Sequence, residues 1–187
     1  MNHVGTRELR TDRLVLRRFI IADAPAMYGN WASDDEVTTF LTWPTHTSVD
    51  VSRAVLEEWM RDYARDDCYQ WAIVPAEPTG QLKDQPVGSI SAVEVDDDLS
   101  AILIGYCIGR AWWHQGITSE ALSAVMDFFF DVVGANRVGC KHDTRNPRSG
   151  LVMQRCGMRY EGTLRGAARN NQGICDVSWY AMLRQDR

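Results

Sequence analysis

The sequence has few of the features that would place it in a membrane, outside the cell or on nucleic acid. None of its apolar runs approaches the roughly 18–20 residues that span a bilayer, and residues 1–8 lack the apolar stretch of a secretion signal. Acidic residues outnumber basic ones, 25 to 20, for a net charge of −5, whereas nucleic-acid-binding chains usually carry a basic surplus. We therefore expect a cytoplasmic protein with neither a membrane nor a direct nucleic-acid partner.

The five cysteines and four histidines lack the spacing of a disulfide framework or a metal site. The cysteines are odd in number and form no Cys-x-x-Cys pair, which favours reduced, mostly buried thiols. The histidines show no metal-ligand spacing, and neither a Gly-x-Ser-x-Gly elbow nor a Ser-His-Asp order is present. We expect no metal and no hydrolase triad.

Length and composition are those of one ordinary globular domain over residues 1–187. The chain is 45% apolar and 24% charged, which is typical of a protein with a full hydrophobic core. Alternation and turn residues predict seven strands, at 14–19, 69–74, 87–95, 100–108, 137–141, 158–164 and 174–183. Apolar spacing and capping residues predict helices that begin at 23, cover 49–65 and 119–133, and lie between 146 and 157. This mixed order indicates an α+β class.

Three connecting segments have distinctive compositions. Residues 75–86 contain proline, glycine and charge and predict a turn or hairpin loop. The run Asp96-Asp97-Asp98 predicts a solvated hairpin tip; three aspartates can also bind a cation, but no further ligands stand nearby. The segment between the last two strands is rich in glycine, asparagine and arginine and predicts a loop.

The most informative stretch runs from 104 to 122, where an apolar strand feeds a helix through a turn that contains Gly116. The first N–H groups of such a helix lack partners, and the positive end of its dipole points at the turn. That arrangement binds phosphate. Gly116 alone is a weak signal and favours a plain strand-to-helix turn that uses glycine for its geometry.

Several short motifs together resemble the RimJ/RimL-like branch of the GNAT superfamily of N-acetyltransferases. They stand at residues 11–17 (TDRLVLR), 88–90 (GSI), 104–106 (IGY), 113–122 (WHQGITSEAL), 146–149 (NPRS), 156–162 (CGMRYEG) and 176–182 (DVSWYAM). Each is weak, but the ordered set is specific. The resemblance implies a central, mixed, mostly antiparallel twisted sheet of about seven strands, flanked by helices and splayed between the fourth and fifth strands.

The resemblance also implies an activity and its partners. Members transfer acetyl from acetyl-CoA to a primary amine by direct attack in a ternary complex, and this branch points to the N-terminal α-amine of a protein. Three alternatives remain open: a small-molecule amine such as an amino acid, polyamine or antibiotic; a larger acyl group such as succinyl; or a catalytically weak acyl-CoA-binding module. Members of this branch are often dimers, so we expect a homodimer.

The resemblance implies a set of residues that bind the donor. They are Cys107, Ile108, Gly109, Arg110, His114, Gln115, Gly116, Ile117, Thr118, Ser119, Asn146 and Ser149. The loop departs from the pattern Trp-Gly-x-Gly-x-Ala, because only Gly116 is kept. Backbone N–H groups bind phosphate, so we expect side chains to be tolerated where φ stays negative. His114 and Thr118 then add donors.

The catalytic residues implied by the resemblance are Ser149, Asn146 and Tyr180. Ser149 would protonate the departing thiolate, Asn146 would contact the donor, and an N–H near Ile108 would hold the oxyanion. Each also has a structural explanation: a serine in the first helical turn, an N-cap and a core tyrosine.

On the acceptor side, the sequence lacks an expected glutamate and is rich in aromatic residues. The glutamate that some members carry before the last strand is replaced by Ala167-Ala168-Arg169, which favours a weakly basic acceptor amine. Glu161 is near in sequence but fits a structural role better. Tyr28, Trp31, Phe40 and Trp43 lie where members bind the acceptor, although simple packing explains most of them.

Overall fold

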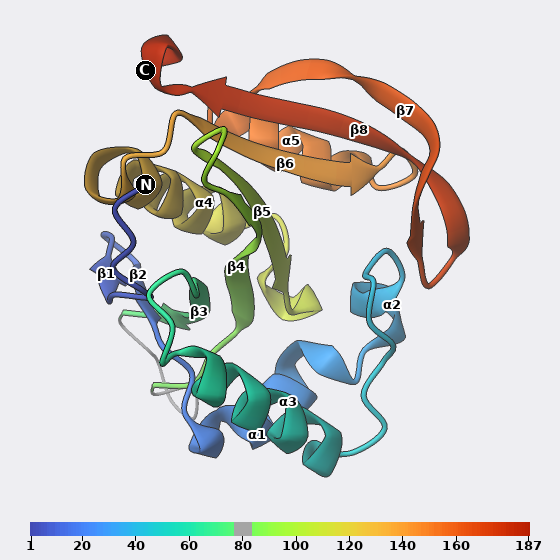
Figure 1. Cartoon of the computed structure of the whole chain (residues 1–187). Coiled ribbons are helices and arrows are strands. Elements are labelled where there is room, and N and C mark those ends of the chain that lie inside the picture. The colour runs from blue at the N-terminus through green and yellow to red at the C-terminus, as the bar shows by residue number, and fades with distance from the viewer. Residues whose placement is uncertain (77–83) are drawn as a thin grey trace.

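The computed structural model describes residues 1–76 and 84–187, which form one open sheet with helices on both faces (Figure 1). Its eight strands lie in the order β1-β2-β3-β4-β5-β6-β8-β7. Their bounds are β1 Leu9–Arg10, β2 Leu14–Arg17, β3 Gln70–Pro75, β4 Gly88–Asp96, β5 Ala101–Ile108, β6 Arg137–Asp143, β7 Arg159–Asn170 and β8 Gly173–Leu183. Among these strands, β5 and β6 pair in parallel and all other neighbours pair antiparallel.

The helices divide between the two faces of the sheet. One core contains side chains of α4 and α5, and the other contains side chains of α1, η2 and α3. The helices are η1 Ile21–Asp23, α1 Ala24–Met27, η2 Tyr28–Ala32, α2 Asp35–Thr38, α3 Val49–Asp62, η4 Arg110–Trp112, α4 Ile117–Phe128, η5 Phe129–Val133, α5 Pro147–Arg155 and η6 Arg184–Asp186. Among the described residues, no helix is both long and apolar enough to cross a membrane.

The predicted sheet is confirmed in type, with two differences in detail. The seven predicted strands correspond to β2–β8, and the eighth is the two-residue β1, which is too short to show a pattern. The predicted loop between the last two strands is wrong, because β7 runs to Asn170 and β8 starts at Gly173. Pairing with β8 overrides the loop-like composition, and a bulge between Leu164 and Ala168 absorbs the irregularity. The predicted turn at 75–86 falls mostly on residues 77–83, outside the described residues.

The splay lies where it was predicted, between the fourth and fifth of those seven strands. β5 pairs with β6 only from Ala101 to Ile104, opposite Arg137 to Cys140. Beyond these residues each strand keeps its outer partner, so β5 follows β4 and β6 follows β8. Figure 1 shows the two strands diverging there, and we call this opening the β5–β6 gap.

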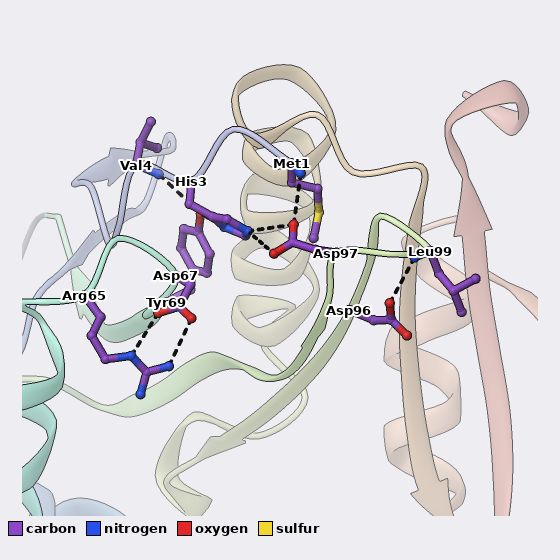
Figure 2. Close-up of polar contacts among 9 residues, drawn as sticks. All are labelled: Met1, His3, Val4, Arg65, Asp67, Tyr69, Asp96, Asp97 and Leu99. Carbon is purple, nitrogen blue, oxygen red and sulfur yellow. Dashed lines mark hydrogen bonds and ion pairs between the residues drawn. The ribbon is translucent and has the colours of Figure 1, made fainter.

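The acidic turn between β4 and β5 is a hairpin tip, as predicted, but one of its aspartates is engaged by the N-terminal segment (Figure 2). The Met1 ammonium lies 2.9 Å from Asp97, and His3 Nε2 lies 3.0 Å from the same carboxylate. His3 Nδ1 lies 2.9 Å from the hydroxyl of Tyr69. Asp96 accepts a bond from the N–H of Leu99. This tip is therefore part of the packed end of the sheet.

The helix that follows the turn at Gly116 is held by the main core. The predicted apolar positions Leu122, Val125 and Met126 are all buried, and Phe129 and Val133 continue the stripe into η5. Rings of Tyr69, just before β3, and Trp71, on β3, pack against those of Phe128 and Phe129 at centroid distances of 5.0–6.0 Å. Gly134 ends the helix in the left-handed region, at φ 83°. The N-terminus of α4 is thus set by packing on one face of the sheet.

Candidate active site

The start of α4 presents unpaired backbone donors. The helix begins at Ile117, two residues earlier than predicted, and Gly116 occupies the N-cap at φ 75°. The first bond into the helix runs from the N–H of Glu120 to the carbonyl of Gly116 at 3.0 Å. Among the described residues, none accepts a hydrogen bond from the N–H groups of residues 116–119. The Ser119 hydroxyl is also buried without a partner. This end of the helix can therefore hold an anion.

The N-terminal segment holds the turn before α4 in place. The Thr11 hydroxyl donates to the Glu120 carboxylate at 2.5 Å, and the guanidinium of Arg13 donates to the carbonyl of Gln115 at 3.0 Å. Burial acts to raise the pKa of Glu120, but the bonds from Thr11 and Arg13 outweigh it and lower that pKa. Glu120 therefore stays ionised at neutral pH and keeps its bonds to Thr11 and Arg13; we call these three residues the Glu120 clamp.

His114 adopts a backbone conformation that its sequence position did not reveal. Its φ is 62°, in the left-handed region, so the condition of a negative φ, under which side chains were expected to be tolerated, is not met at His114. Histidine is several-fold enriched among the non-glycine residues that adopt this region. His114 stands where the pattern Trp-Gly-x-Gly-x-Ala has its first glycine. Glycine suits this position because it adopts a positive φ without strain. The loop keeps the required shape at the cost of local strain.

The donor residues predicted at the end of β5 have distinct environments. Cys107 and Ile108 lie beyond the last residue paired with β6, at the β5–β6 gap. The Cys107 thiol lies half-buried beside Ser89, and burial raises its pKa. At Gly109 an added Cβ would meet the carbonyl oxygen of Asn30 at 2.2 Å, so only glycine fits. Arg110 forms ion pairs with Asp34 and Glu36, and these pairs connect this end of β5 to α2.

Ser149 and Asn146 lie at the start of α5. The Ser149 hydroxyl is 2.9 Å from the hydroxyl of Tyr106 on β5. Burial raises the pKa of Tyr106 well above its ordinary value. Asn146 occupies the predicted N-cap position before Pro147, but its side chain makes no capping bond. The Asn146 amide is therefore not committed to its own helix.

Tyr180 is not brought together with Ser149. Its hydroxyl accepts a bond from Gln154 at 3.1 Å, and its ring lies 5.7 Å from that of His142. These residues line a pocket of about 270 Å³, which also includes Ser178 but not Ser149. Tyr180 is only 7% exposed, which agrees with its explanation as a core tyrosine. The Tyr180 hydroxyl is bonded to Gln154 and the Ser149 hydroxyl to Tyr106, and a catalytic role for Tyr180 stays a prediction.

The β7–β8 hairpin reaches the α2 region across the β5–β6 gap. Asn171, at its tip, donates from the backbone to the carbonyl of Leu41 at 3.1 Å. Its side chain donates to the carbonyls of Thr38 and Trp43, both at 2.8 Å. A pocket of about 450 Å³ lies at this junction; it is lined by Asp35, Thr38, Thr39, Pro44, Thr45, Asn171 and Gln172. Two distant parts of the chain therefore close around one side of the gap, as Figure 1 shows for α2 and the hairpin.

The aromatic residues predicted for the acceptor side differ in exposure and contacts. Trp31 is fully buried, so its ring serves packing, although its indole N–H has no partner. The ring of Trp43 lies 5.2 Å from that of His46 in a tilted arrangement, and the Tyr28 hydroxyl donates to the carbonyl of Thr47 at 3.5 Å. The ring of Phe40 lies 6.0 Å from the guanidinium of Arg145, which follows β6 in the far half of the sheet.

Two carboxylates that could serve as bases are engaged by arginines. The Arg145 guanidinium donates to Asp143 at 2.6 Å and holds the pKa of that carboxyl well below its ordinary value. Arg137 donates to Glu161 at 2.6 Å and lowers its pKa in the same way. Both carboxylates are therefore weak bases. Glu161 has the structural role that the sequence favoured.

Three groups of residues at the site were missed by the sequence predictions. Tyr106 belongs to the IGY motif, and Thr11, Arg13 and Glu120 belong to two other quoted motifs, but spacing does not show that they meet. Arg148 lies over the ring of Trp113 at 5.7 Å and adds a cation beside the start of α4. A motif of the resemblance was the only signal for Tyr106 and Glu120.

Comparison with known proteins agrees with this geometry. Residues 13–159 match the family model described as an acetyltransferase (GNAT) domain. N-acetyltransferase p20 of Bacillus licheniformis is 26% identical over 95% of this chain and 97% of its own. The ribosomal-protein-serine acetyltransferase of Escherichia coli is 31% identical over 54% of this chain and 56% of its own.

Solved structures share the fold over nearly the whole chain. RimL, a ribosomal L7/L12 α-N-protein acetyltransferase in complex with coenzyme A, superposes with a TM-score of 0.83 at 22% identity, covering 97% of this chain and 100% of its own. The microcin C7 self-immunity acetyltransferase MccE, in complex with acetyl-CoA and AMP, has a TM-score of 0.79 at 21% identity. The match covers 92% of this chain and 93% of the MccE chain. With its family model matched over most of its length, this chain belongs to the GNAT family of acetyltransferases.

Proposed function

We propose that this protein transfers acetyl from acetyl-CoA to the N-terminal α-amine of a protein. The observation that carries the proposal is the β5–β6 gap, which opens beside the unpaired N–H groups of α4 and beside the Ser149 hydroxyl. One opening thus combines an anion site, an exposed strand edge and a hydroxyl donor. The E. coli relative named as a ribosomal-protein-serine acetyltransferase supports a protein acceptor.

The residues at the gap fit the donor. N–H groups from Gln115 to Ser119 would hold the pyrophosphate, and the buried, partnerless Ser119 hydroxyl supports an anion there. The backbone of Cys107 and Ile108 would pair with the pantetheine arm as an added strand does. RimL with bound coenzyme A and MccE with bound acetyl-CoA have the same fold.

The chemistry needs little from side chains. Bound acetyl-CoA supplies the acetyl group as a thioester, so the amine nitrogen forms the new C–N bond while the C–S bond breaks. A backbone N–H near Ile108 would stabilise the oxyanion. Ser149 would give its hydrogen to the departing sulfur and regain one, through water, from the proton that the amine loses. Asn146, with its amide free of the helix cap, would bind the donor.

The acceptor follows from the protonation of the amine. An α-amine with a pKa of about 7.7–8.0 is about a tenth or more neutral at pH 7, whereas a lysine side chain near 10.4 is neutral in roughly one part in a few thousand. Asp143 and Glu161 are both held by arginines and kept weakly basic. A site of this kind favours an amine that arrives already neutral.

The test compares acceptors at one fixed concentration of acetyl-CoA, with products identified by mass spectrometry. The acceptors are a peptide with a free α-amine and no lysine, the same peptide with a blocked α-amine and one lysine, and spermidine. We expect acetylation of the free α-amine to be at least tenfold faster than the others. Faster reaction of lysine or spermidine would overturn the protein N-terminus as acceptor. Thermal stabilisation by coenzyme A without any turnover would indicate a binding module.

A further inference from the structure

Tyr106 lies at the point where the sheet opens. It is two residues beyond Ile104, the last residue of β5 that is paired with β6. Its ring packs with the core that contains Ile104 and Ile108, on the face covered by α4 and α5. From there its hydroxyl reaches α5, 43 residues later in the sequence. Tyr106 is therefore a side-chain link between β5 and the helix that carries Ser149.

If both contacts of Tyr106 with Ser149 are hydrogen bonds, the hydrogens of the two hydroxyls can be assigned in only one way. The Tyr106 hydroxyl lies 3.0 Å from the Ser149 carbonyl oxygen and 2.9 Å from the Ser149 hydroxyl. A carbonyl only accepts, so Tyr106 donates its single hydrogen there. Ser149 then donates its own hydrogen to the phenol oxygen. Burial raises the pKa of Tyr106, so the phenol keeps its hydrogen across the working pH range.

This link decides where the Ser149 hydroxyl points. A serine in the first turn of a helix has three staggered rotamers, and it readily bonds to the backbone of its own helix. In this structure the Ser149 hydroxyl bonds instead to Tyr106, on the strand that borders the β5–β6 gap. Without the phenol hydroxyl, nothing on β5 would hold the serine in that rotamer.

We propose that Tyr106 is a positioning residue that aims the Ser149 hydroxyl at the gap and supports it during transfer; this rests on the proposed function. For transfer, Ser149 turns its hydrogen from the phenol oxygen to the sulfur, and the Tyr106 hydroxyl turns from the carbonyl to the serine oxygen and donates to it. Charge that develops on that oxygen is then stabilised by a hydrogen bond. Tyr106 keeps its own proton, and the balance of the reaction is unchanged.

The experiment is a double-mutant cycle on acetyl transfer, with Tyr106→Phe, Ser149→Ala and the double variant. We expect S149A to lower kcat about 100-fold, as for loss of a general acid. Y106F should lower kcat about tenfold, the effect of one hydrogen bond, with the KM for acetyl-CoA within twofold of the wild type. The double variant should be no slower than S149A, because Tyr106 acts through Ser149.

A matched control is Tyr160→Phe, which removes a phenol hydroxyl from the exposed strand β7, where it bonds to Thr163 at 2.8 Å. Its kcat should not change. Unchanged kcat in Y106F, or losses that multiply in the double variant, would overturn the proposal. A wild type without turnover on any amine would overturn the proposed function instead. In that case the contact between Tyr106 and Ser149 is tested by urea unfolding of the same variants. A midpoint shift of the double variant equal to the sum of the single shifts would contradict the contact, and a smaller shift would support it.

Discussion

Arg13 donates from Nε to the Glu120 carboxylate at 2.7 Å, across 107 residues of sequence. Arg13 follows the short strand β1, and Glu120 lies in the first turn of α4, so the pair joins the edge of the sheet to the proposed phosphate site. The same guanidinium holds the carbonyl of Gln115. Neither residue belongs to the loop itself, yet both determine where its N–H groups point.

Replacing Glu120 with Gln is expected to weaken donor binding without changing the chemistry. The variant loses the ion pair with Arg13, and the turn from Gln115 onwards gains freedom that binding must then remove. We expect the Kd for coenzyme A, measured by calorimetry, to rise about three- to tenfold, with kcat at saturating donor within twofold of the wild type. Glu58→Gln, an exposed change on α3, is the control. Equal Kd values for the two variants would show that the clamp does not support the site.

Replacing His114 with Gly is expected to stabilise the fold. At φ 62° a side chain is strained by about 1–2 kcal/mol, and glycine removes that strain while adding about 0.5–1 kcal/mol of unfolded-state entropy. The net gain should be up to about 1 kcal/mol in the free energy of urea unfolding. His114→Ala keeps the strain and should show no gain. A fall in coenzyme A affinity in both variants would show that the imidazole contacts the donor.

The stability of the protein should fall in acid partly through Asp143. Arg145 holds the pKa of this carboxyl below its unfolded value, so its contribution is complete above about pH 4. That contribution is lost as the pH falls towards the native pKa. Asp143→Asn should cost about 1–2 kcal/mol at pH 7 and show a smaller drop between pH 7 and pH 3. Asp50→Asn, at an exposed site, should retain the wild-type drop. Parallel pH profiles for D143N and the wild type would contradict this assignment.

Loss of the Asn171 side chain is expected to affect the acceptor more than the donor. Its amide makes the two bonds to the carbonyls of Thr38 and Trp43 that close the hairpin over α2. Asn171→Ala should raise the KM for the amine severalfold and leave the KM for acetyl-CoA within twofold, in steady-state assays that vary one substrate at a time. Asp98→Ala, an exposed change at the tip between β4 and β5, should change neither. A rise confined to the acetyl-CoA KM would place the acceptor elsewhere.

Local chemistry in the sequence was enough to predict most elements of the fold. The stripe of Leu122, Val125 and Met126 predicted α4 because helical periodicity is a local property, and Gly134 marked its end for the same reason. Motif order predicted the strands that diverge. The continuation of β7 beyond Leu164 was missed, because pairing with a neighbouring strand overrode a composition typical of loops.

The amino-acid sequence by itself determined which segments become strands and helices and which backbone groups are left unpaired at Gly116. Only the tertiary structure decided that Tyr106 meets Ser149, that Arg13 meets Glu120, and that Tyr180 bonds to Gln154. The physical reason is the distance along the sequence over which each kind of interaction acts. Caps and periodicity act within a few residues, whereas these contacts depend on the strand order and on the angle at which β5 and β6 part.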